Sequence, residues 1–341
     1  MVDLLPLLLF AAAGTALAWK GGEVLVASSD RLGAYYGLPA IVQGAIIAAV
    51  GSSFPELSST VIAAVIYNEF EIGVGAIVGS AVFNILVIPA VSALLGEGSL
   101  ASNRDLVYKE AQFYILSIAV LLLTFSMAVI YFPTLGNGTR LDGTLYWWLA
   151  LAPVAFYGLY IFIQYHDTIE YVPDVPIDTG RIDPRREWGM LVVSLVLILV
   201  GAEFLVRAAV GLGDAFGTST FLWGLTVVAA GTSLPDTFVS VSAARVGNAS
   251  VSLANVLGSN IFALLVALPA GVIAAGQTTV DFGVVVPMMG FLIVASIAFF
   301  GVLRTDMVLS RRESYLLLGF YGVFIVWLIS ESLGVTNLVR L

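Results

Sequence analysis

Residues 51–56 read Gly-Ser-Ser-Phe-Pro-Glu, and residues 231–236 read Gly-Thr-Ser-Leu-Pro-Asp. Each stretch lies within a long apolar run, where a glycine, two hydroxyl residues, a proline and a carboxylate are all out of place. The second stretch begins 180 positions after the first (231 − 51) in a chain of 341 residues. The same pattern at two well-separated positions predicts an internal repeat.

The surroundings of these stretches indicate a membrane protein. The chain is 60% hydrophobic and 11% charged, whereas a soluble domain has about 25% charged residues. Apolar segments of roughly 20 residues, the length that spans a bilayer, recur along the chain, so we expect an all-α polytopic protein surrounded by membrane lipid. The ten predicted transmembrane helices lie at residues 3–29, 39–66, 72–96, 109–133, 144–165, 188–212, 218–245, 250–276, 281–303 and 313–334.

Charges between the predicted helices indicate the orientation. If the N-terminus lies outside, the outside segments carry only two basic residues, Arg140 and Arg340, and the inside connectors carry ten. These ten are Arg31, Arg104, Lys109, Arg181, Arg185, Arg186, Arg245, Arg304, Arg311 and Arg312. Lys and Arg are in excess on the cytoplasmic side of membrane proteins, so we predict a multi-pass protein of the cell membrane with its N-terminus outside.

The repeat extends beyond the two motifs. A shift of 180 positions aligns Gly21 with Gly201 and Gly44 with Gly224, and after a one-residue slip Gly79-Ser80 matches Gly258-Ser259. We therefore expect a first five-helix repeat at 1–165, an acidic cytoplasmic linker at 166–187 and a second five-helix repeat at 188–341. Because five is odd, the second repeat enters the bilayer from the opposite side. Inverted repeats with a midplane site between them are an architecture of transporters.

Glu56 and Asp236 fall near the middle of their predicted helices, and a carboxylate at this depth marks a functional site by default. Pro55 and Pro235 each remove a backbone donor, which predicts free carbonyl oxygens about three to four residues upstream. Hard cations such as Ca²⁺ take about six to eight oxygen ligands, and two Na⁺ balance the same charge. The candidate ligands of one midplane cation site are the side chains of Glu56, Asp236, Ser52, Ser53, Thr232 and Ser233 and the carbonyls of Ala49 and Ala229.

Further polar residues lie on the next predicted helix of each repeat. Ser80 and Asn84 are four residues apart and so share one helix face, and Ser259 matches Ser80. We expect these three side chains to line the cation site, and the neighbouring glycines to allow close helix packing. Ala263 occupies the position that matches Asn84. Asn84 is therefore expected to be the partner of Glu56, and the first repeat to dominate cation binding.

Together these residues resemble the cation/calcium antiporter superfamily, and within it the sodium/calcium exchanger type as found in prokaryotes or archaea. Regions 44–84 and 224–263 look like that family's two alpha repeats. The resemblance implies an antiporter that exchanges Ca²⁺ for Na⁺, with no enzymatic activity and no cofactor apart from the transported ions. It also assigns ligand roles to the residues named above, and implies that the first and sixth helices slide to alternate access. We expect a monomeric functional unit.

Two departures from the family pattern leave alternatives open. Asp236 stands where many sodium/calcium exchangers have Glu, and potassium-dependent exchangers also have Asp there. However, Ala263 falls where those potassium-dependent proteins have a further Asp, which argues against K⁺ co-transport. A Ca²⁺/H⁺ antiporter is the other alternative, because two carboxylates can carry protons. Those relatives typically show G-N-A-x-E, whereas the hydroxyl pairs at 52–53 and 232–233 look like the sodium type.

Composition argues against other classes. The net charge of −9, with acidic residues gathered in the connectors, disfavours a nucleic-acid partner. The chain has no cysteine and one histidine, His166 at a predicted helix end, so thiolate sites are excluded and imidazole ligation is disfavoured. An intramembrane hydrolase would need an activated nucleophile or an open metal site, and channels usually form their pore from symmetric subunits.

Overall fold

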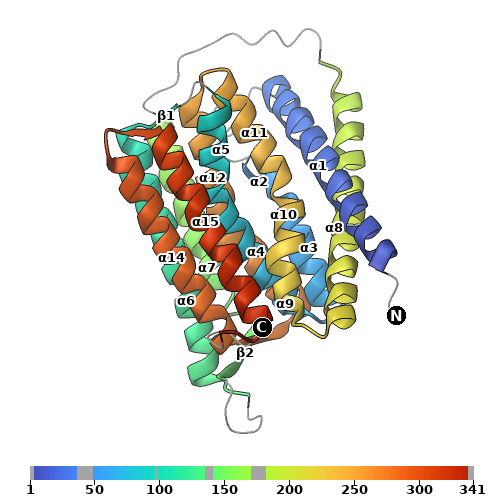
Figure 1. Cartoon of the computed structure of the whole chain (residues 1–341). Helices are drawn as coiled ribbons and strands as arrows, with labels where there is room; N and C mark the ends of the chain where they lie inside the picture. The colour runs from blue at the N-terminus through green and yellow to red at the C-terminus, as the bar shows by residue number, and fades with distance from the viewer. Residues whose placement is uncertain (1–3, 37–48, 97–98, 135–140, 170–181, 337–341) are drawn as a thin grey trace.

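The computed structural model describes residues 4–36, 49–96, 99–134, 141–169 and 182–336 of the chain (Figure 1). The first part contains the helices α1 (Leu4–Tyr35), α2 (Ala49–Ser52), α3 (Phe54–Val65), α4 (Phe70–Leu86), α5 (Ile88–Leu95), α6 (Ala111–Tyr131) and α7 (Leu151–Ile169). The second contains α8 (Pro184–Phe216), α9 (Thr220–Trp223), α10 (Ala229–Thr232), α11 (Leu234–Arg245), α12 (Ala249–Phe262), α13 (Leu268–Ala275), α14 (Phe282–Arg304) and α15 (Arg311–Ser332). Short π-helical segments lie at Asp105–Glu110, Gly224–Val228 and Ala263–Ala267.

Two small antiparallel sheets join the two parts of the chain at opposite ends of the molecule. Strand β1 (Ser99–Ala101) pairs with β4 (Val308–Ser310), and β2 (Asp142–Tyr146) pairs with β3 (Gln277–Asp281). The fold is otherwise helical, as expected. In the described residues, seven helices are long and apolar enough to cross a membrane by length and composition, and the helices at Phe54–Val65 and Thr220–Thr232 are shorter but apolar.

Several predicted helix boundaries are corrected by the structure. The predicted helices at 72–96 and 250–276 are found as the spans Phe70–Leu95 and Ala249–Ala275, the second with a π-helical segment, whereas 218–245 and the described part of 39–66 are interrupted before their prolines. The predicted helix at 144–165 begins only at Leu151, because residues 142–146 pair in a sheet. Hydropathy shows that a segment is apolar but not where its backbone hydrogen bonding is broken, so a sequence of this kind reads as one helix. Most of the predicted linker, residues 170–181, lies outside the described residues.

The breaks at Ser53 and Ser233 place the two carboxylates. Ser53 has φ −95° and ψ 6°, and α3 begins directly after it. Ser233 has φ −80° and ψ −3°, and α11 begins directly after it. Both helices carry proline in their first turn, where the missing N–H costs nothing. The prolines therefore start new helices whose first turns hold Glu56 and Asp236.

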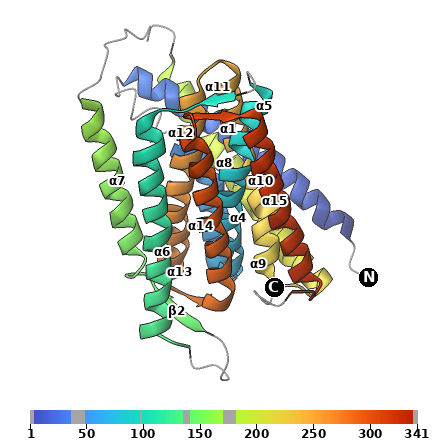
Figure 2. The ribbon, with the colours of Figure 1, turned by 60° about the vertical axis from the view of Figure 1, so that its left-hand side comes forward.

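Helices α1 and α8 form an antiparallel pair on one flank of the molecule (Figure 1). Glycines allow the close approach: a Cβ on Gly14 would lie 2.8 Å from the Gly201 carbonyl oxygen, and one on Gly201 would lie 2.7 Å from the Ala18 nitrogen. Helices α6, α7, α14 and α15 lie on the other flank, with α7 at the edge beside α6 (Figure 2). The broken helices lie between these two groups.

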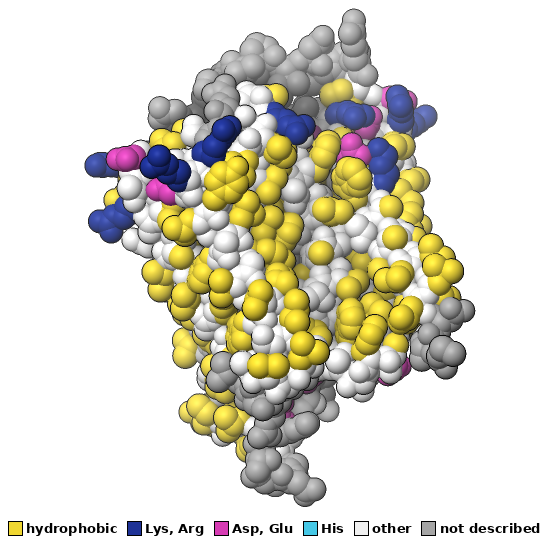
Figure 3. Space-filling model, in the orientation of Figure 1, with side chains coloured by type: hydrophobic (Ala, Val, Ile, Leu, Met, Phe, Trp, Pro, Cys, Tyr) yellow, Lys and Arg dark blue, Asp and Glu magenta, His cyan; other side chains and the backbone are white. Residues whose placement is uncertain are grey.

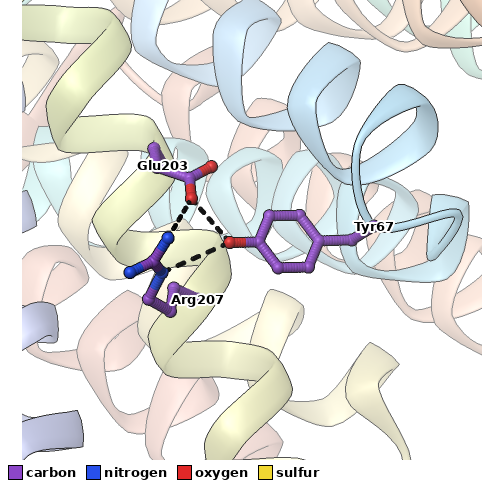
Figure 4. A network of polar contacts seen from close by, with 3 residues as sticks. All are labelled: Tyr67, Glu203 and Arg207. Atoms are coloured by element: carbon purple, nitrogen blue, oxygen red, sulfur yellow. Dashed lines mark hydrogen bonds and ion pairs between the residues drawn. The ribbon is translucent and has the colours of Figure 1, made fainter.

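A polar network ties this helix pair to the turn after α3. Figure 4 shows the Tyr67 hydroxyl donating to Glu203 Oε1 at 2.6 Å and Arg207 Nη2 donating to the same oxygen at 3.0 Å. The Arg207 guanidinium also lies 5.5 Å from the ring centroid of Phe10 on α1. Glu203 and Arg207 thus form an ion pair on α8, and its link to Tyr67 joins α8 to the turn after α3.

Helix α4 packs against the π-helical segment at Gly224–Val228 with almost no space between the backbones. A Cβ on Gly79 would lie 2.2 Å from the Leu225 carbonyl oxygen. We expect Gly79→Ala to lower the free energy of unfolding by about 1–3 kcal/mol, the usual cost of overpacking, measured as a lower thermal midpoint in detergent. The matched control is Gly290→Ala on α14, where a Cβ meets no atom within 4 Å. Equal midpoints for the two variants would contradict the close approach.

Candidate cation-binding site

Glu56 and Asp236 are buried at the N-terminal ends of α3 and α11. Glu56 is 1% exposed and Asp236 is 0% exposed. Neither carboxylate is found in an ion pair with a Lys or Arg of the described residues, unlike the glutamates that pair with Lys20, Arg31 and Arg207. A helix N-terminus favours a nearby negative charge by about 0.3–2 kcal/mol. That offsets only part of the cost of several kcal/mol for a buried charge, so the site calls for a cation.

Two serine relays hold these carboxylates, and each relay begins in the opposite half of the chain. The Ser233 hydroxyl donates to Ser80 Oγ at 2.7 Å, and Ser80 donates to Glu56 Oε1 at 3.3 Å. Ser259 donates to Asp236 Oδ2 at 2.6 Å, which uses its one proton, so its hydrogen bond with Ser53 has Ser53 as the donor.

The two relays consist of matching residues. Ser53 and Ser233 differ by 180 positions, as do Glu56 and Asp236, and Ser80 and Ser259 differ by 179. A second crossing has the same symmetry: the Ser52 hydroxyl lies beside the Asp236 carboxylate, and the Thr232 hydroxyl lies beside that of Glu56. The two copies of the motif are thus brought face to face, with each carboxylate contacted by hydroxyls of the other copy.

Three buried oxygen atoms in this cluster have no hydrogen-bond partner: Glu56 Oε2, Asp236 Oδ1 and Asn84 Oδ1. A buried acceptor without a partner costs about 1–3 kcal/mol, and more when it is charged. Three such acceptors, two of them on carboxylates, are an arrangement that a positively charged ligand would satisfy. In the described residues no group of three or more His, Cys, Asp or Glu side chains could hold a metal ion. The donor set is therefore two carboxylates with neutral oxygens, which suits hard cations such as Ca²⁺ and Na⁺.

Asn84 has a different partner from the one expected. The sequence predicted that it would serve Glu56 and leave Asp236 with only Ala263. Instead Asn84 Nδ2 donates to Asp236 Oδ2 at 3.1 Å. Ser80 and Asn84 do share one face of α4, but that face passes between the carboxylates, so Ser80 contacts Glu56 and Asn84 contacts Asp236. The expectation that the first repeat dominates the site loses its basis.

The carbonyl of Ala229 is only partly available. It accepts the Ser233 N–H at 3.0 Å and the Thr232 hydroxyl at 3.4 Å. The carbonyl that would have bonded the missing N–H of Pro235 is that of Gly231, four residues earlier. Ala49 begins α2, and its side chain lies outside the description. Backbone oxygens beside the break before α11 thus lie next to the hydroxyl cluster.

One further residue of the cluster, Asn260, was not predicted. Asn260 on α12 accepts from Asn84 Nδ2 at 3.0 Å and donates to the hydroxyl of Tyr114 on α6 at 3.2 Å. Asn260 matches Ala81 in the first repeat (260 − 179), so no polar residue recurs there to draw attention to it. The only signal was an amide next to Ser259 in an apolar segment.

Comparisons with known proteins identify relatives of this chain. The profile of the sodium/calcium exchanger protein family matches residues 6–166 and 186–330. The sodium/calcium exchanger MaX1 of Methanosarcina acetivorans is 29% identical over 335 residues, covering 90% of this chain and 94% of its own. The inner membrane protein YrbG of Escherichia coli is 28% identical over 266 residues, covering 74% of this chain and 78% of its own.

A solved structure shows the same fold. The sodium-calcium exchanger NCX_Mj, soaked with 100 mM Na⁺ and 10 mM Sr²⁺, matches with a TM-score of 0.63 at 23% identity, over 95% of this chain and 99% of its own. The family profile spans nearly the whole chain, including both motifs. The chain therefore belongs to the sodium/calcium exchanger family, within the cation/calcium antiporter superfamily.

Proposed function

We propose that this protein is a secondary active antiporter that exchanges Ca²⁺ for Na⁺ by alternating access at the site between Glu56 and Asp236. The observation that carries the proposal is the set of three unpaired buried oxygens held by the two relays. Two ionised carboxylates give a charge of −2, which one Ca²⁺ or two Na⁺ neutralise. The two cations then compete for the same oxygens, and such competition is the physical basis of exchange. No residue is proposed to be catalytic.

The proposed architecture is ten membrane crossings in two inverted repeats, at 1–165 and 188–341, with 166–187 as the linker. In support, every α-helix and strand described in the first part has a counterpart in the same order in the second, and only the π-helical segment at Asp105–Glu110 has none. Each two-stranded sheet also takes one strand from each part, because β1 pairs with β4 and β2 pairs with β3. The matching helices α1 and α8 run antiparallel, as inverted repeats require. The functional unit we propose is one chain.

The proposed orientation in the cell membrane has the N-terminus outside. Figure 3 shows Lys and Arg side chains gathered at one end of the molecule. At that end α11 finishes at Arg245 and α15 begins at Arg311, whereas α1 begins and α15 ends at the other. Basic residues favour the cytoplasmic side, which supports this orientation.

Ion gradients imposed one at a time test the proposal. In proteoliposomes we expect an outward Na⁺ gradient to drive uptake of radioactive Ca²⁺, and a pH or K⁺ gradient alone to drive none. Uptake driven by the pH gradient in Na⁺-free buffer would favour the alternative, a Ca²⁺/H⁺ antiporter. A need for K⁺ is disfavoured because Ala263, buried at 3% exposure, offers no side-chain ligand. Single-channel currents in a planar bilayer would overturn antiport altogether.

A further inference from the structure

Asn260 is a fully buried amide whose two ends are both engaged. Asn260 is 0% exposed. Its Nδ2 donates to the Ala81 carbonyl oxygen at 3.2 Å and to the Tyr114 hydroxyl at 3.2 Å, and its Oδ1 accepts from Asn84 Nδ2 at 3.0 Å. None of these partners is a carboxylate, so Asn260 adjoins the site without contacting Glu56 or Asp236.

The Ala81 contact fixes which way the Asn260 amide faces. A backbone carbonyl oxygen can only accept a hydrogen bond, so the nitrogen end of the amide must face Ala81. The oxygen end then faces Asn84. A flipped Asn260 would set its oxygen against the Ala81 oxygen and its N–H groups against those of Asn84, so the hydrogen bonds to Ala81 and from Asn84 would both be lost, at about 1–3 kcal/mol for each buried group.

The orientation of Asn260 in turn fixes that of Asn84. The Asn84 amide has two N–H donors, and they serve two acceptors, Asn260 Oδ1 and Asp236 Oδ2. Asn84 Oδ1 is consequently the end left without a partner, buried beside the Asp236 carboxylate. If the amide flipped, an N–H group rather than an oxygen would face the cation.

We infer that Asn260 is a positioning residue that holds the Asn84 amide so that Asn84 Oδ1 is presented to the transported cation. The inference rests on the proposed function, because it assigns a role within the same cation site. Asn260 comes from α12 of the second part and acts on α4 of the first. Asn84, held in this way, places an amide beside Asp236 of the second part, in which Ala263 occupies the position matching Asn84.

A double-mutant cycle tests the inference. We expect Asn260→Ala and Asn84→Ala each to raise the KM for Ca²⁺ by about tenfold, with a smaller change in maximal rate. The double variant should be no worse than Asn84→Ala alone, because residues that act as a unit are not additive. Multiplied effects in the double variant, or an unchanged KM in Asn260→Ala, would overturn the inference. The readout is Na⁺-driven Ca²⁺ uptake over a range of Ca²⁺ concentrations.

Three controls complete the experiment. Asn260→Leu keeps the side-chain volume nearly constant, so it should show the same rise in KM if lost positioning rather than a cavity is the cause; a normal KM would overturn the inference. Tyr114→Phe removes one acceptor but leaves the Ala81 carbonyl to orient Asn260, so its KM should change less than about twofold. Wild-type protein that takes up no Ca²⁺ under a Na⁺ gradient would refute the proposed function itself, whereas active wild type with a normal Asn260→Ala refutes only the positioning role.

Discussion

Replacing Glu56 by glutamine is expected to abolish Na⁺-driven Ca²⁺ uptake. Glutamine keeps the shape of the side chain but removes one of the two charges of the site and places an N–H₂ group where the cation meets an oxygen. Glu56 is 1% exposed, so water does not compensate. Removing one partner of a buried charge pair costs about 3–5 kcal/mol, which is more than about a hundredfold in affinity. Radioactive Ca²⁺ uptake into Na⁺-loaded proteoliposomes measures the effect.

Glu23→Gln is the matched control for this substitution. Glu23 lies on α1 and pairs with Lys20 at 2.7 Å, and both side chains are exposed. Exposed pairs contribute about 0–1 kcal/mol, so this variant should transport at the wild-type rate. Normal transport by Glu56→Gln would mean that the cation site lies elsewhere.

The sequence was sufficient to identify the two carboxylates because their signal is local. A carboxylate beside a proline in an apolar run is rare, and its recurrence after 180 positions linked Glu56 to Asp236 without any structure. The hydroxyls at 52–53 and 232–233 were found in the same way, since they belong to the same two motifs. All four lie in the cluster around the carboxylates.

Contacts between the halves could not be predicted from local patterns. Asn84 was assigned to Glu56 because both belong to the first repeat, yet it bonds to Asp236 of the second. That partner depends on how α4 packs against α3 on one side and against α10 and the π-helical segment before it on the other, which is a property of tertiary packing. Asn260 was missed for a related reason, because its role depends on the Ala81 carbonyl of a distant helix.

The interruptions at Ser53 and Ser233 were only half visible in the sequence. Proline predicts a missing donor, and therefore an opened turn within a continuous helix. In the structure a new helix starts at that point and the carboxylate occupies its first turn. The helix N-terminus thus adds to the site, which a reading of one long apolar segment does not reveal.

Replacing Asp236 by asparagine is expected to abolish exchange as completely as the change at Glu56, with a loss of at least about a hundredfold. Asp236 accepts from Ser259 at 2.6 Å and from Asn84 at 3.1 Å on one oxygen, and its other oxygen is unpaired. An amide nitrogen in place of Oδ2 would face the Ser259 and Asn84 donors, and one in place of Oδ1 would face the cation. Because each carboxylate is held by an equivalent relay, the two losses should be similar. A first repeat that dominated binding would instead make the loss at Asp236 clearly smaller.

Asp236→Glu separates charge from reach in the same assay. The charge is kept, but the residue is 0% exposed and its carboxylate already contacts Ser259 and Asn84, so an extra methylene displaces one of them. Overpacking costs about 1–3 kcal/mol, so we expect uptake to persist with a KM for Ca²⁺ raised by about tenfold or more. Asp214→Asn, an exposed position on α8, is the matched control and should transport normally. Wild-type uptake by Asp236→Asn would show that charge at this position is not required, and would remove Asp236 from the cation site.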